Sequence, residues 1–489
     1  MRLAVFAQNR ALWLDEAMLA NNIVDRAPAA LLQPLADDQA APVGFLMLEK
    51  AVISVFGPGE RPLRAVPLAG GILCLLCLML LVRRVADPRA GLIALALAAV
   101  CGPLIYYASE VKQYSTDAAC AALLLVIGWP LTRPDGLVST ARATGLASAG
   151  AVAVWISYPV AFVLAGVGAL GLGAARGDRK RQGMTIAIGA AWLLSFAALY
   201  VVSLRHLVGH TGLRGYWQNA FPPLSPAAVP WAYRTALGIM RSPVGLSAAA
   251  LAVVCCVVGG RSVWTRDRSA FALLVAPVAF AFLAALFRRY PFEGRVMLFV
   301  VPALLVLIAH GVGWLWALPG GRGRLPAIVA LALLAFYPLR LSAALVGRTA
   351  PPPEVLAEAA IPPREQLRDV LAQVRARARD GDRILVYPLA RPAFTFYTSR
   401  DPIHPGAVPA ALRVPRSAAD ARRLVAEHDG ARRLWVVFSH VLKGPNAVDD
   451  ESLTLLLLDD FATRIEEVRS DGASAYLYAL PAPFGGGAR

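Results

Sequence analysis

The chain has 489 residues and a net charge of +16, and 57% of its residues are hydrophobic while only 16% are charged. Soluble domains carry about 25% charged and about 45–50% apolar residues. The composition therefore excludes a single water-soluble globule and an intrinsically disordered chain. It predicts a polytopic membrane protein with a soluble domain. Cytoplasmic loops rich in arginine account for the basic surplus, so we expect no nucleic-acid partner.

Ten apolar segments are predicted to cross the membrane, because a spanning helix needs about 20 mostly apolar residues. Eight are single runs: 64–83, 89–107, 116–131, 184–204, 244–260, 269–287, 295–317 and 325–345. The stretch 143–174 is too long for one helix at ~1.5 Å per residue. Ser157-Tyr158-Pro159 interrupts it, and proline disfavours helix at the preceding residue. We predict two helices there, 143–157 and 159–174.

The basic loops predict the orientation of these helices. Arginine and lysine concentrate in five loops: 83–89, 133–142, 176–181, 261–268 and 322–324. These loops are expected on the cytoplasmic side. The alternate loops are less basic and are expected to face outward: 108–115, 205–243 and 288–294.

The same alternation places residues 1–63 on the outer side, as a first outer loop with short amphipathic helices. Only the apolar run 3–7 precedes this loop, and it is too short for a signal-peptide core or a spanning helix. We therefore expect that a first transmembrane helix is missing, which would bring the number of spans to 11 or more. The transmembrane helical bundle itself is assigned to residues 64–345.

Residues 346–489 differ in character and are predicted to form an extracytoplasmic α/β domain. Pro351-Pro352-Pro353 and Pro362-Pro363 predict a stiff linker. Beyond it, helical patterns alternate with apolar strand patterns, which is typical of an α/β fold. The predicted helices are 365–380, 418–428 and 451–460, and the predicted strands are 383–389, 433–438 and 473–480. No glycine-rich phosphate loop is present, so we predict no nucleotide site.

Two adjacent carboxylates lie in the first outer loop, in Trp13-Leu14-Asp15-Glu16-Ala17, called the acidic motif below. Such a pair can act as a base or bind a metal. It can also have a structural role, because Asp15 as an N-cap would start a helix through residues 16–24. The residues alone leave these alternatives open.

The acidic motif resembles that of the GT-C superfamily of membrane glycosyltransferases, which includes glycosyltransferase family 39, the protein mannosyltransferases and the lipid A aminoarabinose transferases. Residues 105–114 (Ile-Tyr-Tyr-Ala-Ser-Glu-Val-Lys-Gln-Tyr) are similar to the acidic-aromatic motif of the second outer loop, and residues 290–295 to a later arginine-bearing element. The resemblance covers about residues 11–345 and is strongest over the first 130. This sequence departs from the motifs of the superfamily at two places. Ala40-Ala41-Pro42 stands where relatives have a His-Pro-Pro motif, and Lys112 stands where they have an arginine.

The resemblance implies an inverting transfer of a sugar from a polyprenyl-phosphate donor to a hydroxyl acceptor on a lipid, glycan or protein. This reaction needs a base at the acceptor and cations at the departing phosphate. Asp15 is the candidate base, Glu16 would orient it or bind a metal, and Glu110 would complete the carboxylate cluster. Lys112 and Arg295 would hold the donor phosphate.

Some members of the superfamily use a divalent metal and others do not, so a metal at Asp15 and Glu110 is left open. Tyr114, Tyr216 and Trp217 are candidate contacts for the sugar or the acceptor, although aromatic residues also populate membrane interfaces. The expected location is the bacterial inner membrane.

Two other classes of function are compatible with the sequence. A transporter or flippase for lipid-linked saccharides would need ionisable residues inside the spans, whereas the predicted spans here are nearly free of internal charge. A non-catalytic component of polysaccharide assembly is the other alternative, because the histidine of the His-Pro-Pro motif is absent.

Overall fold

The computed structural model describes residues 1–136, 138–205, 215–347, 356, 361–404, 408–428, 431–442 and 448–481. The chain divides into two compact units. Unit 1 comprises Met1–Gln8 and Arg26–Ile361, and unit 2 comprises Asn9–Asp25 and Pro362–Arg489. The acidic motif therefore belongs to the same unit as the C-terminal domain. Each unit is described by itself.

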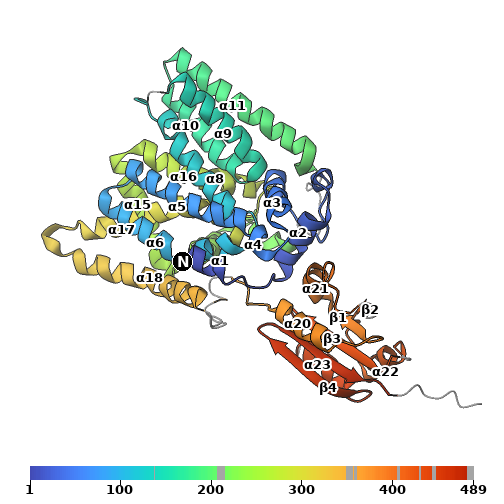
Figure 1. The fold of residues 1–489 in the computed structure, drawn as a ribbon. Coiled ribbons are helices and arrows are strands. Elements are labelled where there is room, and N and C mark those ends of the chain that lie inside the picture. Colours follow the sequence, from blue (N-terminus) through green and yellow to red (C-terminus); the bar gives the residue numbers. More distant parts are fainter. Residues whose placement is uncertain are drawn as a thin grey trace, which may run out of the picture. The chain divides into compact units, whose positions relative to one another are not determined.

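Unit 1 is a bundle of helices (Figure 1). Its N-terminal helices are α1 (Arg2–Ala7), η1 (Pro28–Leu32), α3 (Val43–Phe56), α4 (Glu60–Leu63), α5 (Ala65–Val85), α6 (Pro88–Val100), α7 (Gly102–Tyr106), η2 (Tyr107–Ser109), α8 (Tyr114–Gly128) and η3 (Trp129–Thr132). The middle helices are α9 (Thr140–Ile156), α10 (Val160–Ala174), α11 (Arg179–Leu199), η4 (Tyr200–Leu204), η5 (Gln218–Ala220) and α14 (Ala228–Arg241). The last are α15 (Ala249–Arg266), α16 (Arg268–Leu286), η6 (Gly294–Val300), α17 (Val301–Trp316), η7 (Pro319–Gly321) and α18 (Arg324–Val346).

Each of the ten predicted spans contains helix, although α15 begins only at Ala249, inside the predicted span 244–260. Within the described residues, seven helices are long and apolar enough to cross a membrane. The number rises to eight if α6 and the helical segment after it, which are bent by 58° to each other, count as one span. The described part of the chain thus has fewer full-length spans than the ten predicted. The predicted break at Pro159 is confirmed, because α9 ends at Ile156 and α10 begins at Val160. The chain is thus a multi-pass helical membrane protein.

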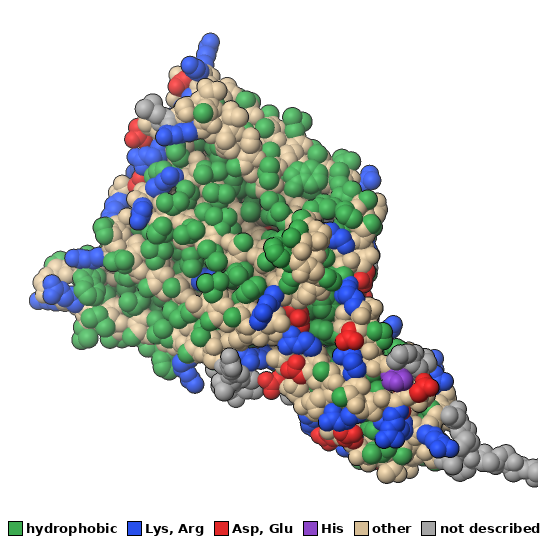
Figure 2. Space-filling view, viewed as in Figure 1, with side chains coloured by type: hydrophobic (Ala, Val, Ile, Leu, Met, Phe, Trp, Pro, Cys, Tyr) green, Lys and Arg blue, Asp and Glu red, His purple; other side chains and the backbone are tan. Residues whose placement is uncertain are grey.

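Four of the five loops predicted to share the cytoplasmic side are joined by contacts in unit 1. Arg133 forms an ion pair with Asp267 at 2.6 Å, and Arg266 forms one with Asp87 at 2.9 Å. Arg181 donates a hydrogen bond to the carbonyl oxygen of Pro134 at 2.6 Å. Figure 2 shows a broad hydrophobic face on unit 1 with basic side chains gathered at its margin. This distribution suits a bundle that exposes apolar side chains to lipid between two polar ends.

Helix α3 buries a carboxylate that the sequence did not single out. Glu49 is fully buried, and neither carboxylate oxygen has a hydrogen-bond partner among the described residues. Burial raises the pKa of Glu49 well above its ordinary value, because it disfavours the charged form. The pKa of Glu49 is therefore higher in the folded than in the unfolded protein. The contribution of this group to folding stability is fully present below the unfolded pKa and is lost as the pH rises through the folded pKa.

Glu49→Gln is therefore expected to raise the free energy of unfolding at pH 8, by about 1–3 kcal/mol. The gain should shrink towards acidic pH, where the wild-type carboxyl is neutral. Thermal unfolding in detergent at several pH values between 5 and 8 measures the difference in unfolding free energy between Glu49→Gln and the wild type. We expect this difference to lie within about 0–3 kcal/mol and to grow with pH. Glu293→Gln, at an exposed position of the same unit, should change nothing. A gain for Glu49→Gln that did not depend on pH would contradict the assignment.

Unit 2 contains a five-stranded sheet in the order β2-β1-β3-β5-β4. Its elements are α2 (Leu14–Asp25), α20 (Leu367–Arg377), β1 (Arg383–Val386), η8 (Pro388–Ala390), α21 (Arg391–Thr398), β2 (Val408–Ala411), α22 (Ala418–Ala426), β3 (Arg433–Ser439), α23 (Asp450–Leu458), β4 (Thr463–Ser470) and β5 (Ala473–Ala479). Strands β2, β1 and β3 are parallel, while β5 and β4 run antiparallel to their neighbours. The six elements predicted for the C-terminal domain are all present.

The sequence did not predict β2, α21 or β4. Strand β2 is only Val-Pro-Ala-Ala, and proline within a strand confines it to an edge. Strand β4 exposes the charged side chains of Glu467 and Arg469, and charges on an edge strand protect it against further pairing. Both edges of the sheet therefore lack the apolar pattern that revealed the central strands.

Candidate functional site

The acidic motif is held by side chains of the C-terminal domain within unit 2. The backbone N–H of Ala11 donates to Oε1 of Gln366 at 3.0 Å, and that of Leu12 donates to the hydroxyl of Tyr397 at 2.8 Å. The N–H of Leu14 donates to Oε2 of Glu365 at 3.2 Å. Three backbone donors just before or at the start of α2 are thereby satisfied, and the segment is fixed against the domain.

The structure does not support the alternative in which Asp15 is an N-cap. Helix α2 begins at Leu14, so Asp15 and Glu16 lie in its first turn, where the helix dipole favours negative charge. Glu16 is fully buried and forms an ion pair with Arg10 at 3.5 Å. Asp15 is half-buried. Of the two carboxylates, Asp15 is therefore the more accessible to a reactant.

His440 lies beside the acidic motif, and sequence analysis missed it. Its Nδ1 is 2.5 Å from Oε1 of Glu365, and its ring centroid lies 6.2 Å from that of Trp13. The hydrogen bond to Glu365 raises the pKa of His440 although burial opposes the shift, and the charges of Glu365 and Asp15 act in the same direction. A histidine directly after a buried strand was the only signal in the sequence.

Glu110 and Lys112 lie in unit 1, in the loop between η2 and α8. Glu110 is fully buried, and Lys112 is 4% exposed. The N–H of Lys112 donates to the carbonyl of Glu110 at 2.7 Å, which makes a tight turn rather than a helix. The Nζ of Lys112 donates to Oε1 of Gln39 at 2.5 Å. A buried lysine whose contacts include a neutral amide is a cation well placed to attract an anion.

The segment that replaces the His-Pro-Pro motif lies against the same loop. Gln113 donates through Nε2 to the carbonyl of Ala40 at 3.4 Å, and the hydroxyl of Tyr158 donates to the carbonyl of Ala41 at 2.9 Å. Tyr158 stands at the break between α9 and α10. The structure thus brings together two of the regions that carry the GT-C resemblance.

Arg295 and Tyr114 meet at one end of the bundle. The Cζ of Arg295, in η6, is 5.6 Å from the ring centroid of Tyr114, the first residue of α8. Tyr290 lies nearby, and its hydroxyl donates to the carbonyl of Val296 at 2.7 Å. Because Tyr114 follows Lys112 by two residues, both candidate phosphate-binding cations lie close to the start of α8.

Asp117 is a further buried carboxylate near this end, and sequence analysis did not single it out. It lies in the first turn of α8, and its Oδ1 is buried without a hydrogen-bond partner among the described residues. The sequence feature that could have identified Asp117 is its position as a charged residue inside the apolar run 116–131.

Tyr216 and Trp217 lie just before η5, and their rings pack edge to face with centroids 4.9 Å apart. Tyr216 is 69% exposed. Of the predicted residues, Asp15 and Glu16 belong to unit 2, whereas Glu110, Lys112, Tyr114, Tyr216, Trp217 and Arg295 belong to unit 1.

A metal site does not emerge from this arrangement. Within the described ranges, no group of three or more histidine, cysteine, aspartate or glutamate side chains could hold a metal ion. Divalent metals are usually held by several such ligands.

Comparison with known proteins gives a match at the level of structure. No protein-family model matches the chain, and no curated protein matches its sequence. The apo structure of ArnT from Cupriavidus metallidurans aligns with 97% of this chain and 96% of its own, at 13% identity and a TM-score of 0.53.

Two further solved structures align with lower scores. ArnT from the same organism bound to undecaprenyl phosphate gives a TM-score of 0.47 at 15% identity, covering 97% of this chain and 96% of the other. An oligosaccharyltransferase from Archaeoglobus fulgidus, tethered to an acceptor peptide, gives 0.45 at 13% identity, covering 98% and 71%. The likeness to apo ArnT extends over nearly the whole of both chains, and this chain therefore shares the overall fold of that protein.

Proposed function

We propose that this protein is a membrane glycosyltransferase that transfers a sugar from a polyprenyl-phosphate donor to a hydroxyl acceptor, with inversion, at the outer face of the bacterial inner membrane. The observation that carries the proposal is the pair of cations near the start of α8, Lys112 and Arg295, within a GT-C fold. The ArnT that shares the fold has also been solved with undecaprenyl phosphate bound.

The proposed chemistry is a direct displacement at the anomeric carbon of the sugar. The acceptor hydroxyl attacks the anomeric carbon and loses its proton to Asp15, while the bond between that carbon and the phosphate oxygen breaks. The polyprenyl phosphate leaves as an anion, and Lys112 and Arg295 stabilise its growing charge. Glu16, paired with Arg10, holds the first turn of α2 and so orients Asp15. Glu110 lies on the same tight turn as Lys112 and shapes the loop that presents it.

This function would be tested by measuring the transfer of sugar from defined donors to defined acceptors. The purified protein in liposomes is offered a panel of radiolabelled polyprenyl-phosphate sugars with lipid, glycan and peptide acceptors. Transfer that releases the polyprenyl phosphate supports the proposal and identifies the sugar. Movement of the lipid-linked sugar across the bilayer without transfer would instead establish a flippase. Absence of transfer from every donor by a folded protein would contradict the proposal.

Lys112→Met is expected to weaken donor binding. Hydrogen bonds to charged groups contribute about 1.5–3 kcal/mol, so KM for the donor should rise roughly 10- to 100-fold. Lys112→Arg should retain most of the affinity, because it keeps the charge and adds a fork that suits phosphate. The matched control is Lys180→Met, at an exposed position in the first turn of α11, which should leave KM unchanged. Equal effects from both methionine variants would argue against a phosphate contact at Lys112.

A further inference from the structure

The N-terminal segment that carries the acidic motif is part of the C-terminal domain's own fold. In addition to the three backbone amides already described, Asn21 donates to the carbonyl of Pro392 at 2.9 Å. Arg368 donates to the carbonyl of Asn9 at 3.1 Å, and Arg400 forms an ion pair with Asp25 at 3.2 Å. These contacts run along the whole of residues 9–25. The geometry of the motif is therefore determined by side chains that lie more than 300 positions later in the chain.

Glu365 makes the central contact of this set, and both of its oxygens are engaged. Oε2 accepts the N–H of Leu14, and Oε1 is bonded to Nδ1 of His440. The Glu365 side chain is only 4% exposed. Because Leu14 is the first residue of α2, its N–H has no acceptor inside the helix. A buried carboxylate at that point both satisfies the amide and suits the positive end of the helix dipole.

His440 holds Glu365 from the other side, in a backbone conformation that few side chains adopt. Its φ is +53°, in the left-handed region, which is uncommon outside glycine and asparagine. Such strained positions cluster at functional sites when the surrounding structure enforces them. The hydroxyl of Ser439, the preceding residue, donates to the carbonyl of Gly472 at 3.3 Å and so fixes the end of β3. This conformation turns the imidazole towards Glu365 and Trp13.

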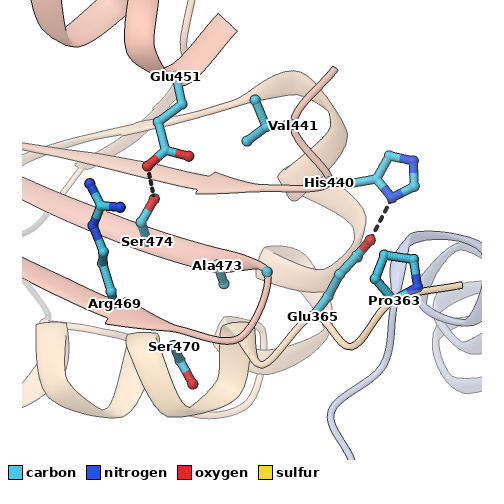
Figure 3. Close-up of a pocket in the computed structure, with 10 residues that line it drawn as sticks. Pro363, Glu365, His440, Val441, Glu451, Arg469, Ser470, Ala473 and Ser474 are labelled. Atoms are coloured by element: carbon cyan, nitrogen blue, oxygen red, sulfur yellow. Dashed lines mark hydrogen bonds and ion pairs between the residues drawn. The ribbon is translucent and has the colours of Figure 1, made fainter. Parts of the chain in front are cut away.

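A cavity of about 380 Å³ opens beside this pair. Figure 3 shows Glu365 and His440 at one end of it, and Glu451 with Ser474 at the other. Glu451 accepts hydrogen bonds from the hydroxyls of Ser474 at 2.7 Å and Tyr476 at 2.6 Å. Those contacts stay within the C-terminal domain. The cavity is thus lined by two carboxylates, of which Glu365 accepts the N–H of Leu14 in the acidic motif, whereas Glu451 accepts from the hydroxyls of two residues of β5.

We propose that Glu365, oriented by His440, is a positioning residue that fixes the first turn of α2 and thereby sets the position of Asp15 for sugar transfer. The inference rests on the proposed function, because it gives the C-terminal domain a part in the catalytic centre. Neither residue is assigned a contact with the reactants. Both act through the backbone of Leu14.

Kinetics of matched variants test the effect on catalysis. Glu365→Ala should lower kcat at least tenfold with little change in donor KM, because it disturbs the base and not the phosphate contacts. Glu365→Gln should recover part of the rate, since its amide oxygen can still accept the N–H of Leu14. Glu451→Gln is the control and should behave as the wild type. An equal loss of kcat in Glu451→Gln would overturn the proposal, because the effect would then belong to the domain in general.

A double variant separates positioning from general loss of structure. If Glu365 acts only through Asp15, adding Glu365→Ala to Asp15→Asn should not lower the residual rate further. A second, multiplicative loss would show that Glu365 acts elsewhere and would overturn the proposal.

Amide hydrogen exchange gives a readout that needs no activity. In Glu365→Ala, and more weakly in His440→Ala, the peptide containing residues 9–16 should exchange at least tenfold faster than in the wild type, while β3 and β5 stay protected. Unchanged exchange would overturn the positioning role whatever the kinetics show. Faster exchange in a protein that transfers no sugar would leave the positioning role standing and refute the proposed function alone.

Discussion

Asp15→Asn is expected to abolish sugar transfer while the protein remains folded. The substitution keeps the size and shape of the side chain but removes the group that would take the proton of the acceptor. General base catalysis typically contributes about 10²–10⁴ in rate, so kcat should fall by that factor while donor KM stays nearly constant. Asp15 is half-buried in the first turn of α2, so a neutral side chain of the same size should leave the fold intact.

The matched control lies on the same helix. Asp25 ends α2 and forms an ion pair with Arg400, in which the Asp25 side chain is 52% exposed. Exposed pairs of this kind contribute little stability, so Asp25→Asn should keep wild-type kcat. Size-exclusion chromatography and thermal unfolding of both variants show whether the fold is intact. Transfer by Asp15→Asn within about threefold of the wild-type rate would remove Asp15 from the role of base.

The helical architecture could be predicted because the features that specify it are local. Apolar runs of spanning length gave the helices, and Pro159 gave the break between α9 and α10. Asp87 and Asp267 cap α6 and α16 through their own side chains, which is a short-range signal of a helix start. The basic loops predicted which ends of the helices lie together, and the ion pair between Arg133 and Asp267 agrees with this grouping.

The surroundings of the candidate site could not be predicted in this way. The contact between Leu14 and Glu365 joins residues 351 positions apart, and no periodicity in the sequence links them. The same holds for Lys112 and Gln39, which meet because the turn at residues 110–113 lies against the segment after η1. Residue types and motif order therefore identified the candidate carboxylates and cations. That Glu365 and His440 lie beside the acidic motif is a result of tertiary packing, which the sequence did not reveal.

The acidic motif shows how a local interpretation failed for a tertiary reason. Asp15 has the residue type of an N-cap, yet α2 begins at Leu14, two residues before the predicted start at residue 16. The N–H of Leu14 is instead bonded to Glu365, a side chain far along the chain. The start of this helix therefore depends on a tertiary contact that a local pattern does not reveal.

Gly311→Ala is expected to destabilise the bundle strongly, because α15 and α17 cross at very close range. A Cβ at Gly311 would lie 2.0 Å from the carbonyl oxygen of Cys255, and one at Gly259 would lie 1.8 Å from that of Leu307. Small residues allow this approach of two backbones in membrane helices. The added methyl group must push the helices apart, which typically costs about 1–3 kcal/mol and occasionally more.

Gly313→Ala, two residues further along α17, is the control for this effect. A Cβ there meets only Ala90, at 3.9 Å, so alanine should be neutral or stabilise the helix by up to about 1 kcal/mol. Thermal unfolding in detergent should separate the two variants clearly, and equal melting temperatures would refute the close crossing. The crossing also bears on the site, because α17 continues directly from η6, which carries Arg295. A bundle loosened at Gly311 should therefore also lose affinity for the donor phosphate, whereas the Gly313 variant should keep it.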